Sequence, residues 1–223
     1  MIPRKIHYFW FGGKKTPLAE RCIASWRKFA PGWELCEWNE SNCDVSHSAF
    51  AAAALAAGKY GFVPDHLRME KVAEEGGVYF DTDVELLRPI DDLVADGPFF
   101  ACESDSPRVI NPGLGFGAER DDPVCKAIAK EYETMSFDPA CHVSQTSPVI
   151  ATKVLACFPE RRCLPACVLN PKGGVAGNVR ISPDTVGIHH FAASWFNWKQ
   201  RLAYIWWPRV RDCVRLFARR CDA

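Results

Sequence analysis

Two aspartates separated by one residue, Asp81 and Asp83, stand where the apolar part of a short β-like segment ends. A helical stretch stops at Gly76-Gly77 just before that segment, so the pair closes a helix–strand unit. Carboxylates are hard oxygen ligands for Mg²⁺ or Mn²⁺, ions that usually accompany phosphate-bearing substrates. The pair therefore points to an enzyme that uses a nucleoside diphosphate compound.

The spacing of the two aspartates limits how they can bind an ion. Residues two apart in an extended strand lie about 6.6 Å apart and point the same way. An ion with metal–oxygen distances of about 2.0–2.2 Å cannot bind both carboxylates unless the chain turns there. We therefore expect Asp83 to bind the metal directly and Asp81 to act through water or to contact a sugar or ribose hydroxyl. The simpler alternative is a pair of solvated acidic residues, because Asp-x-Asp alone is common.

Asp65 and Arg68 lie three residues apart on the preceding helical segment, so their side chains share one face. Asp65 falls in the first helical turn, where the helix dipole favours its ionised form. A carboxylate beside a guanidinium is suited to hold sugar hydroxyls, with Arg68 reaching a phosphate oxygen. Taken alone, the pair is better explained as an intrahelical ion pair worth a few tenths of a kcal/mol.

Further candidates lie later in the chain. His189 and His190 follow a β-like run and precede Ser194-Trp195, and imidazole is an acceptable ligand for Mn²⁺. These residues could complete a metal shell and close a pocket, although a lone histidine is more often a core residue. Asn111 opens a glycine-rich stretch and is a candidate polar contact. The glycines of that stretch do not form the Gly-x-Gly-x-x-Gly dinucleotide pattern.

Strands alternating with helices predict an α/β fold with a single mixed sheet flanked by helices. Strands are expected at residues 5–11, 34–38, 78–80, 84–87, 99–102, 113–117 and 186–191, and helices at 17–29, 46–58, 64–75, 123–134 and 144–157. The sequence has no internal repeat and no Ser/Gly linker. We therefore expect one catalytic domain at residues 1–198, followed by a tail at 199–223.

Composition excludes several classes of protein. The 223 residues carry no formal net charge, so the overall electrostatic potential of the protein does not attract nucleic acid. The start shows no signal-peptide pattern, and no run of about 18 apolar residues could span a membrane. Eleven cysteines without a Cys-x-x-Cys pair indicate reduced thiols, and hence a cytoplasmic location.

The tail differs from the rest of the chain, with seven basic residues against two acidic ones. Trp206, Val210, Val214 and Phe217 recur there at helical spacing. A basic amphipathic helix with tryptophans can lie on an anionic membrane surface, which would place the protein at the inner face of the membrane. Alternatively, the apolar stripe packs on the domain and leaves the arginines in water.

Taken together, several segments in order resemble one family. They are Ile6 to Gly13, Ser25-Trp26, Asp65-x-x-Arg68, Glu75-Gly76-Gly77-Val78-Tyr79-Phe80-Asp81-Thr82-Asp83, and His189 to Trp195. The sequence is similar to DXD-motif glycosyltransferase family 32. That family includes bacterial capsule and lipopolysaccharide sugar transferases, fungal initiating mannosyltransferases and, distantly, the clostridial glucosylating toxins. Pro64 departs from the family pattern, because relatives often carry Ser there.

The resemblance implies a GT-A fold, a UDP- or GDP-hexose donor, Mn²⁺ or Mg²⁺, and transfer with retention of anomeric configuration. The acceptor would be a glycan or a lipid-linked saccharide. By position, donor binding would involve His7, Trp10 stacking on the base, Tyr79, Asn111, and Ser194 with Trp195 over the diphosphate. Asp65 and Arg68 would hold the donor sugar, Asp81 would touch ribose and sugar, and the metal group would be Asp83 with Asp81 and His189.

Two other functions stay open from the residues alone. A metal-dependent nucleotidyl- or phosphotransferase could use the same acidic pair and would release pyrophosphate or phosphate instead of a nucleoside diphosphate. A non-catalytic module that binds a nucleotide sugar would bind the donor without hydrolysing it.

Overall fold

A computed structural model describes residues 1–139, 142–172 and 178–192 of the chain. The strands are β1 (Lys5–Phe9), β2 (Glu34–Trp38), β3 (Gly77–Tyr79), β4 (Val84–Leu86), β5 (Phe99–Asp105), β6 (Arg108–Ile110), β7 (Phe116–Ala118), β8 (Arg162–Leu164) and β9 (Gly187–His189). The helices are α1 (Pro17–Phe29), α2 (Ala49–Ala56), α3 (Pro64–Glu75), α4 (Asp91–Ala95), α5 (Pro123–Glu133), α6 (Ser147–Leu155) and α7 (Ala166–Leu169), with a 3₁₀ turn η1 (His142–Gln145).

Seven of these strands form one mixed sheet in the order β2-β1-β3-β7-β5-β6, with β8 pairing against β5. Strands β1, β2 and β3 run parallel, whereas β7 is antiparallel to both β3 and β5. Strands β4 and β9 form a separate two-stranded antiparallel ladder. The expectation of a mixed sheet flanked by helices is confirmed, and the small second ladder adds to it.

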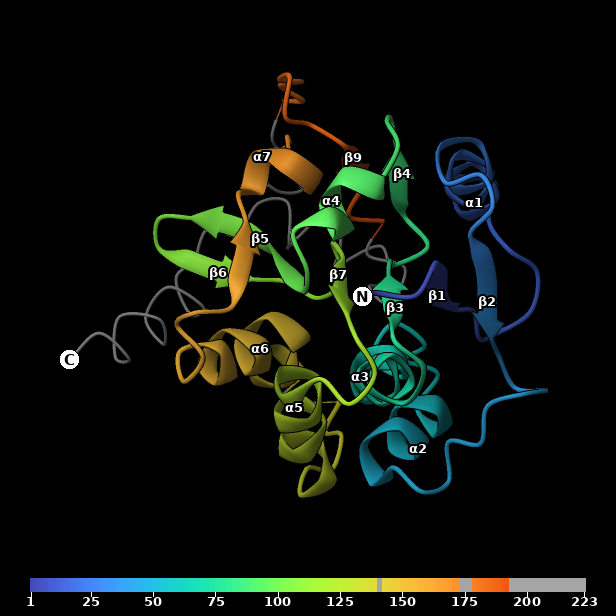
Figure 1. Ribbon diagram of the computed structural model, residues 1–223. Helices are drawn as coiled ribbons and strands as arrows, with labels where there is room; N and C mark the ends of the chain where they lie inside the picture. Colours follow the sequence, from blue (N-terminus) through green and yellow to red (C-terminus); the bar gives the residue numbers. More distant parts are fainter. Residues whose placement is uncertain (140–141, 173–177, 193–223) are drawn as a thin grey trace.

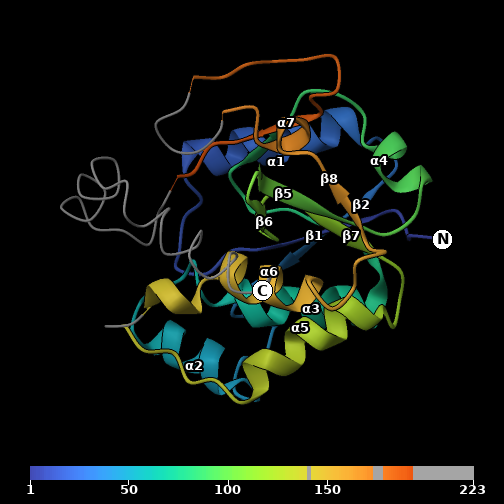
Figure 2. The same cartoon turned by 90° about the vertical axis from the view of Figure 1, so that its left-hand side faces the viewer.

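Helices cover both faces of the sheet (Figures 1 and 2). On one face α2, α3, α5 and α6 pack together, and on the other lie α1, α4 and α7. Each face has its own apolar core, because side chains alternate across a strand. Phe9 and Tyr79 point into the first core, and Ile6, Tyr8 and Val78 into the second.

The helix before the acidic pair begins and ends as its sequence predicts. Pro64 occupies the first turn of α3, where its missing N–H costs nothing. Gly76 and Gly77 have φ values of 66° and 126°, a region that favours glycine. A Cβ on Gly77 would lie 2.9 Å from the Lys5 carbonyl oxygen. The two glycines therefore let the chain leave α3 and pair at once with β1.

Trp26 of α1 fixes the segment that follows the acidic pair. The indole is fully buried and donates a hydrogen bond from Nε1 to the carbonyl oxygen of Val84, at 2.7 Å. The neighbouring Ser25 hydroxyl accepts a hydrogen bond from the Leu86 amide, at 2.9 Å. Through these two contacts α1 holds β4 in place.

The predicted elements agree closely with the structure, apart from short ones. The stretch 113–117 is a turn followed by β7, because Gly113 to Gly115 lie outside any strand. Elements of three to five residues, namely α4, β6, β8 and α7, lie in segments for which the sequence predicts no helix or strand. Among the described residues, no helix is both long enough and apolar enough to cross a bilayer. The tail at 199–223 lies outside those residues.

Candidate functional site

The chain turns immediately after β3, and this turn brings the two aspartates together. The Val84 amide donates to the Asp81 carbonyl oxygen at 3.0 Å, and the Asp81 amide donates to the Gly113 carbonyl oxygen at 3.1 Å. The ligand atoms of Asp81, Asp83 and His189 all lie within 4.8 Å of one another. The extended geometry that would keep the carboxylates apart is therefore absent, and both can face one ion.

His189 reaches this site through the small ladder, in which it pairs with Val84. Its Nε2 lies 3.0 Å from Oδ1 of Asp83, while the Ala192 amide donates to Oδ2 of Asp83 at 2.7 Å. The His190 amide also donates to the Asp83 carbonyl oxygen, at 2.9 Å. These contacts make residues 189–192 a cover over one side of Asp83.

Burial opposes charge on both Asp83 and His189 more strongly than any other single effect. Their mutual attraction and hydrogen bonds nevertheless prevail, so the pKa of Asp83 is lowered and that of His189 is raised. Two groups that are 15% and 8% exposed thus form a buried ion pair. A bound metal ion would replace the proton on His189 as the positive charge that stabilises ionised Asp83.

The three side chains fit Mn²⁺ or Mg²⁺. Two carboxylates and one imidazole suit a hard ion that accepts nitrogen, and they leave other positions for water and phosphate oxygens. The 3.0 Å separation of Nε2 and Oδ1 is close to that expected for adjacent ligands about 2.1 Å from an octahedral ion. The Nδ1 atom of His189 is buried and has no hydrogen-bond partner among the described residues.

Arg68 lies between the two carboxylates of Asp65 and Asp81. Its Nη2 contacts Oδ1 of Asp65, and its Nη1 lies 3.1 Å from Oδ1 of Asp81. The guanidinium carbon also lies over the Tyr79 ring, 4.7 Å from its centre, and the Tyr79 hydroxyl donates to Oδ1 of Asp81 at 2.6 Å. Because the Arg68 side chain is only 2% exposed, these contacts mainly hold the two carboxylates in place.

The pKa of the Asp65 carboxyl lies well above its ordinary value. Burial raises its pKa to about 7, although the charge of Arg68 and hydrogen bonds from Ser147 lower it. Burial likewise raises the pKa of the Tyr79 hydroxyl, which stays protonated and donates to Asp81. Asp65 therefore sits near the midpoint of its titration at neutral pH, beside an arginine that stays charged.

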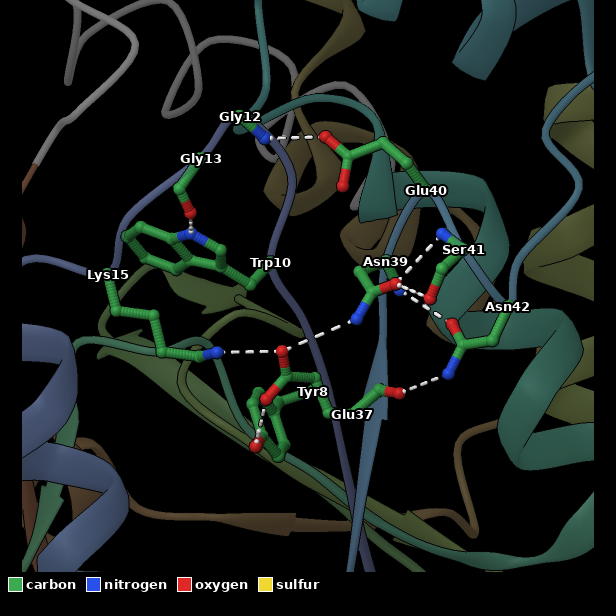
Figure 3. Close-up of polar contacts among 10 residues, drawn as sticks. All are labelled: Tyr8, Trp10, Gly12, Gly13, Lys15, Glu37, Asn39, Glu40, Ser41 and Asn42. Carbon is green, nitrogen blue, oxygen red and sulfur yellow. Dashed lines mark hydrogen bonds and ion pairs between the residues drawn. The ribbon is translucent and has the colours of Figure 1, made fainter.

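Trp10 lies just beyond the carboxyl end of β1 (Figure 3). Its indole Nε1 donates to the Gly13 carbonyl oxygen at 2.7 Å, and the Gly12 amide donates to Glu40 at 2.7 Å. Nearby, Glu37 accepts hydrogen bonds from both Tyr8 and Lys15. Strands β1 and β3 are parallel neighbours, so Trp10 and Asp81, which come just after them, lie at the same edge of the sheet. Ligands of α/β sheets bind outside the carboxyl ends of the strands.

His7 does not line this edge. It is fully buried, its Nδ1 accepts a hydrogen bond from Nε1 of Trp38 at 3.2 Å, and its Nε2 donates to the Gly76 carbonyl oxygen at 2.9 Å. Burial lowers its pKa, consistent with a neutral ring. The geometry does not support the expected contact between His7 and a donor, because both ring nitrogens already serve the junction of β1, β2 and α3.

The other predicted residues divide into three groups. Ser194 and Trp195 lie outside the described residues. His190 turns away from the metal cluster and pairs with Glu85 at 2.8 Å. Asn111 lies in the loop that contacts Asp81, where its Oδ1 accepts a hydrogen bond from the Gly113 amide at 2.8 Å.

Sequence reasoning missed two residues of the site, Gly113 and Glu103. A Cβ on Gly113 would lie 2.3 Å from Oδ2 of Asp81, so the carboxylate rests directly against this glycine. Glu103 of β5 accepts a hydrogen bond from Nδ2 of Asn111 at 2.8 Å. Neither belongs to a motif, and only the return of β6 and its loop toward β3 reveals them.

Comparison with known proteins assigns the class. Residues 17–100 match the family described as "Glycosyltransferase sugar-binding region containing DXD motif". The matched segment includes Asp65, Arg68, Asp81 and Asp83, and over these residues it confirms the resemblance to DXD-motif glycosyltransferases. The chain therefore carries a glycosyltransferase-like, DXD-containing sugar-binding domain.

A solved structure supports the same architecture. The "PaToxG Glycosyltransferase" is similar to the chain with a TM-score of 0.53 over 70% of each chain, at 14% sequence identity. At that identity the likeness concerns the fold, which is GT-A-like. No curated protein sequence matches the chain.

Proposed function

We propose that this protein transfers a hexosyl group from a UDP- or GDP-hexose to a glycan or lipid-linked saccharide acceptor, with Mn²⁺ or Mg²⁺ as cofactor. What carries the proposal is the convergence of Asp81 and Asp83 with His189, beside the buried Asp65–Arg68 pair. The four aspartate and arginine residues lie inside the segment 17–100 that matches the sugar-binding family, and His189 joins them from outside it. Retention of anomeric configuration is part of the proposal through the family resemblance alone.

In this proposal Asp83, Asp81 and His189 hold the metal ion. When bound, that ion supplies Lewis-acid stabilisation of the negative charge on the diphosphate leaving group. Asp65 hydrogen-bonds hydroxyls of the donor sugar, on the side where positive charge develops at the ring. Arg68 keeps Asp65 and Asp81 in position and adds a fixed positive charge to the site. Its burial favours this role over direct contact with a phosphate.

The remaining donor contacts follow from the sheet edge. Trp10 stacks on the nucleotide base, Tyr79 shapes the pocket next to Asp81, and Asn111 holds the loop that approaches the transferred sugar. Ser194 and Trp195, which follow the covering segment 189–192, close over the diphosphate. These roles rest on family position and on the common edge of β1 and β3.

A donor-hydrolysis panel tests the function. The chain is incubated with UDP- and GDP-hexoses and Mn²⁺, with and without a chelator, and release of the nucleoside diphosphate is measured. We expect one donor to be hydrolysed clearly faster than the others, and the chelator to abolish that activity. Pyrophosphate release would favour a nucleotidyltransferase, and donor binding without product would favour a non-catalytic module. Hydrolysis that persists in the chelator would contradict the metal role.

We also propose a cytoplasmic location with peripheral contact between the tail at 199–223 and an anionic membrane. The reason is the basic, tryptophan-containing composition of the tail, which suits an enzyme with a lipid-linked acceptor. We expect the full chain to sediment with anionic liposomes and not with neutral ones. Loss of the tail should abolish this binding, and sedimentation that is unchanged without it would reject the tail as the contact.

A further inference from the structure

Asp81 has a carboxylate that is held from two sides. Its Oδ1 accepts hydrogen bonds from Arg68 and Tyr79, at 3.1 and 2.6 Å. Its Oδ2 rests against the Cα of Gly113, where a Cβ would lie only 2.3 Å away. The side chain is 32% exposed, so packing alone does not fix it. The position of Gly113 therefore limits where Oδ2 can lie.

The loop that carries Gly113 is held by Asn111, which is 8% exposed. The side-chain Oδ1 of Asn111 accepts a hydrogen bond from the Gly113 backbone amide at 2.8 Å. The backbone amide of Asn111 donates to the Ala101 carbonyl oxygen at 3.0 Å. The Gly113 carbonyl oxygen in turn accepts from the Asp81 amide at 3.1 Å. Asn111 and Gly113 thus connect β5 to the turn after β3 through three hydrogen bonds.

Glu103 sets the orientation of the Asn111 side chain. Its Oε2 accepts a hydrogen bond from Nδ2 of Asn111 at 2.8 Å. A carboxylate only accepts here and a backbone amide only donates, so the two contacts of Asn111 admit a single orientation of its amide group. If Glu103 loses its acceptor, Asn111 can rotate and release the Gly113 turn.

We propose that Glu103 is a positioning residue for the metal site, acting through Asn111 and Gly113 on the carboxylate of Asp81. This inference rests on the proposed metal-dependent function and goes beyond it, because Glu103 lies outside the DXD motif and outside the segment 17–100 that matches the family. Groups that orient metal ligands commonly change metal affinity or activity by about 10–100-fold when removed.

The test measures Mn²⁺ affinity directly, by titration in the absence of donor, together with donor hydrolysis. Glu103→Ala is expected to weaken Mn²⁺ binding by about 10-fold or more. Glu103→Gln keeps an acceptor oxygen and should bind Mn²⁺ nearly as the unmodified chain does. Glu34→Ala, an exposed glutamate of β2 that pairs with Lys5, is the matched control and should change nothing.

Two further variants keep the proposal falsifiable if Glu103→Ala folds poorly. Gly113→Ala pushes directly on Asp81, and its backbone has no left-handed strain, so it should reproduce the loss of affinity. Glu103→Ala combined with Asn111→Ala should cost no more than the larger single loss, because both act on one path. Additive losses would overturn the proposal, as would Glu103→Gln matching Glu103→Ala.

The outcomes separate this inference from the proposed function. If the unmodified chain binds Mn²⁺ and hydrolyses a donor while Glu103→Ala does both equally well, only the positioning role is wrong. If the unmodified chain binds no Mn²⁺, the metal-dependent function and the positioning role fail together.

Discussion

Asp83→Asn is expected to lower metal-dependent donor turnover by about 10²–10³-fold, the loss typical when one group that stabilises developing charge is removed. Asp83 is the most deeply enclosed carboxylate of the metal cluster, held by His189 at 3.0 Å and by the Ala192 amide at 2.7 Å. Asparagine preserves its shape but removes the charge that attracts a cation. Mn²⁺ titration and the rate of nucleoside diphosphate release check this result.

The matched control for this substitution is Asp121→Asn. The side chain of Asp121 is 70% exposed and forms a surface ion pair with Lys126. It is not part of the metal cluster. We expect unchanged metal binding and turnover in that variant. If Asp83→Asn keeps its fold, binds Mn²⁺ with unchanged affinity and retains full turnover, the metal role of Asp83 is wrong.

Well above pH 7, Arg68→Met is expected to reduce the free energy of unfolding by about 3–5 kcal/mol, because the ionised carboxylate of Asp65 is then buried without its cation. Asp65 is 5% exposed and Arg68 is 2% exposed, so water cannot replace the lost charge. Methionine keeps most of the apolar stem, which separates the loss of charge from the loss of packing. Urea unfolding followed by circular dichroism measures the difference, and turnover should fall as Asp65 and Asp81 lose their orientation.

The loss caused by Arg68→Met should depend on pH. The pKa of Asp65 is about 7 in the folded chain, raised from 3.8 by burial, so folding becomes less favourable as pH rises between these values. Removing Arg68 raises this pKa further. Below about pH 5 both folded forms hold Asp65 protonated, so this part of the difference vanishes there, and it grows above pH 7.

Arg4→Met is the control for the stability prediction. Arg4 forms an ion pair with Asp91 at 2.6 Å, but the two side chains are 64% and 43% exposed. Exposed pairs contribute about 0–1 kcal/mol, so this variant should unfold almost as the unmodified chain does. An equal loss in Arg4→Met and Arg68→Met would show that burial of the Asp65–Arg68 pair does not matter.

Local patterns predicted the long elements of this fold. The helices at 17–29 and 64–75 and the strand at 34–38 begin and end where the sequence places them, because prolines, glycines and apolar spacing act within a few residues. The short strands β6 and β8 carry no such signal, since three residues gain their stability from pairing with β5. Local sequence likewise does not show where strand pairing begins. For that reason the stretch 113–117 was predicted as a strand, although its first half is a turn that precedes β7.

The order of residues along the chain was enough to indicate the chemistry, because Asp65 and Arg68 share one helix face and Asp81 and Asp83 follow a buried strand. The turn after β3 decided that the two carboxylates of Asp81 and Asp83 can face one ion. Contacts between distant segments came from the packing of the sheet. His189 meets Asp83 through the register of β4 and β9, and Glu103 meets Asn111 where β5 and β6 pair. Such registers depend on which surfaces are buried together, and no spacing within a few residues encodes them.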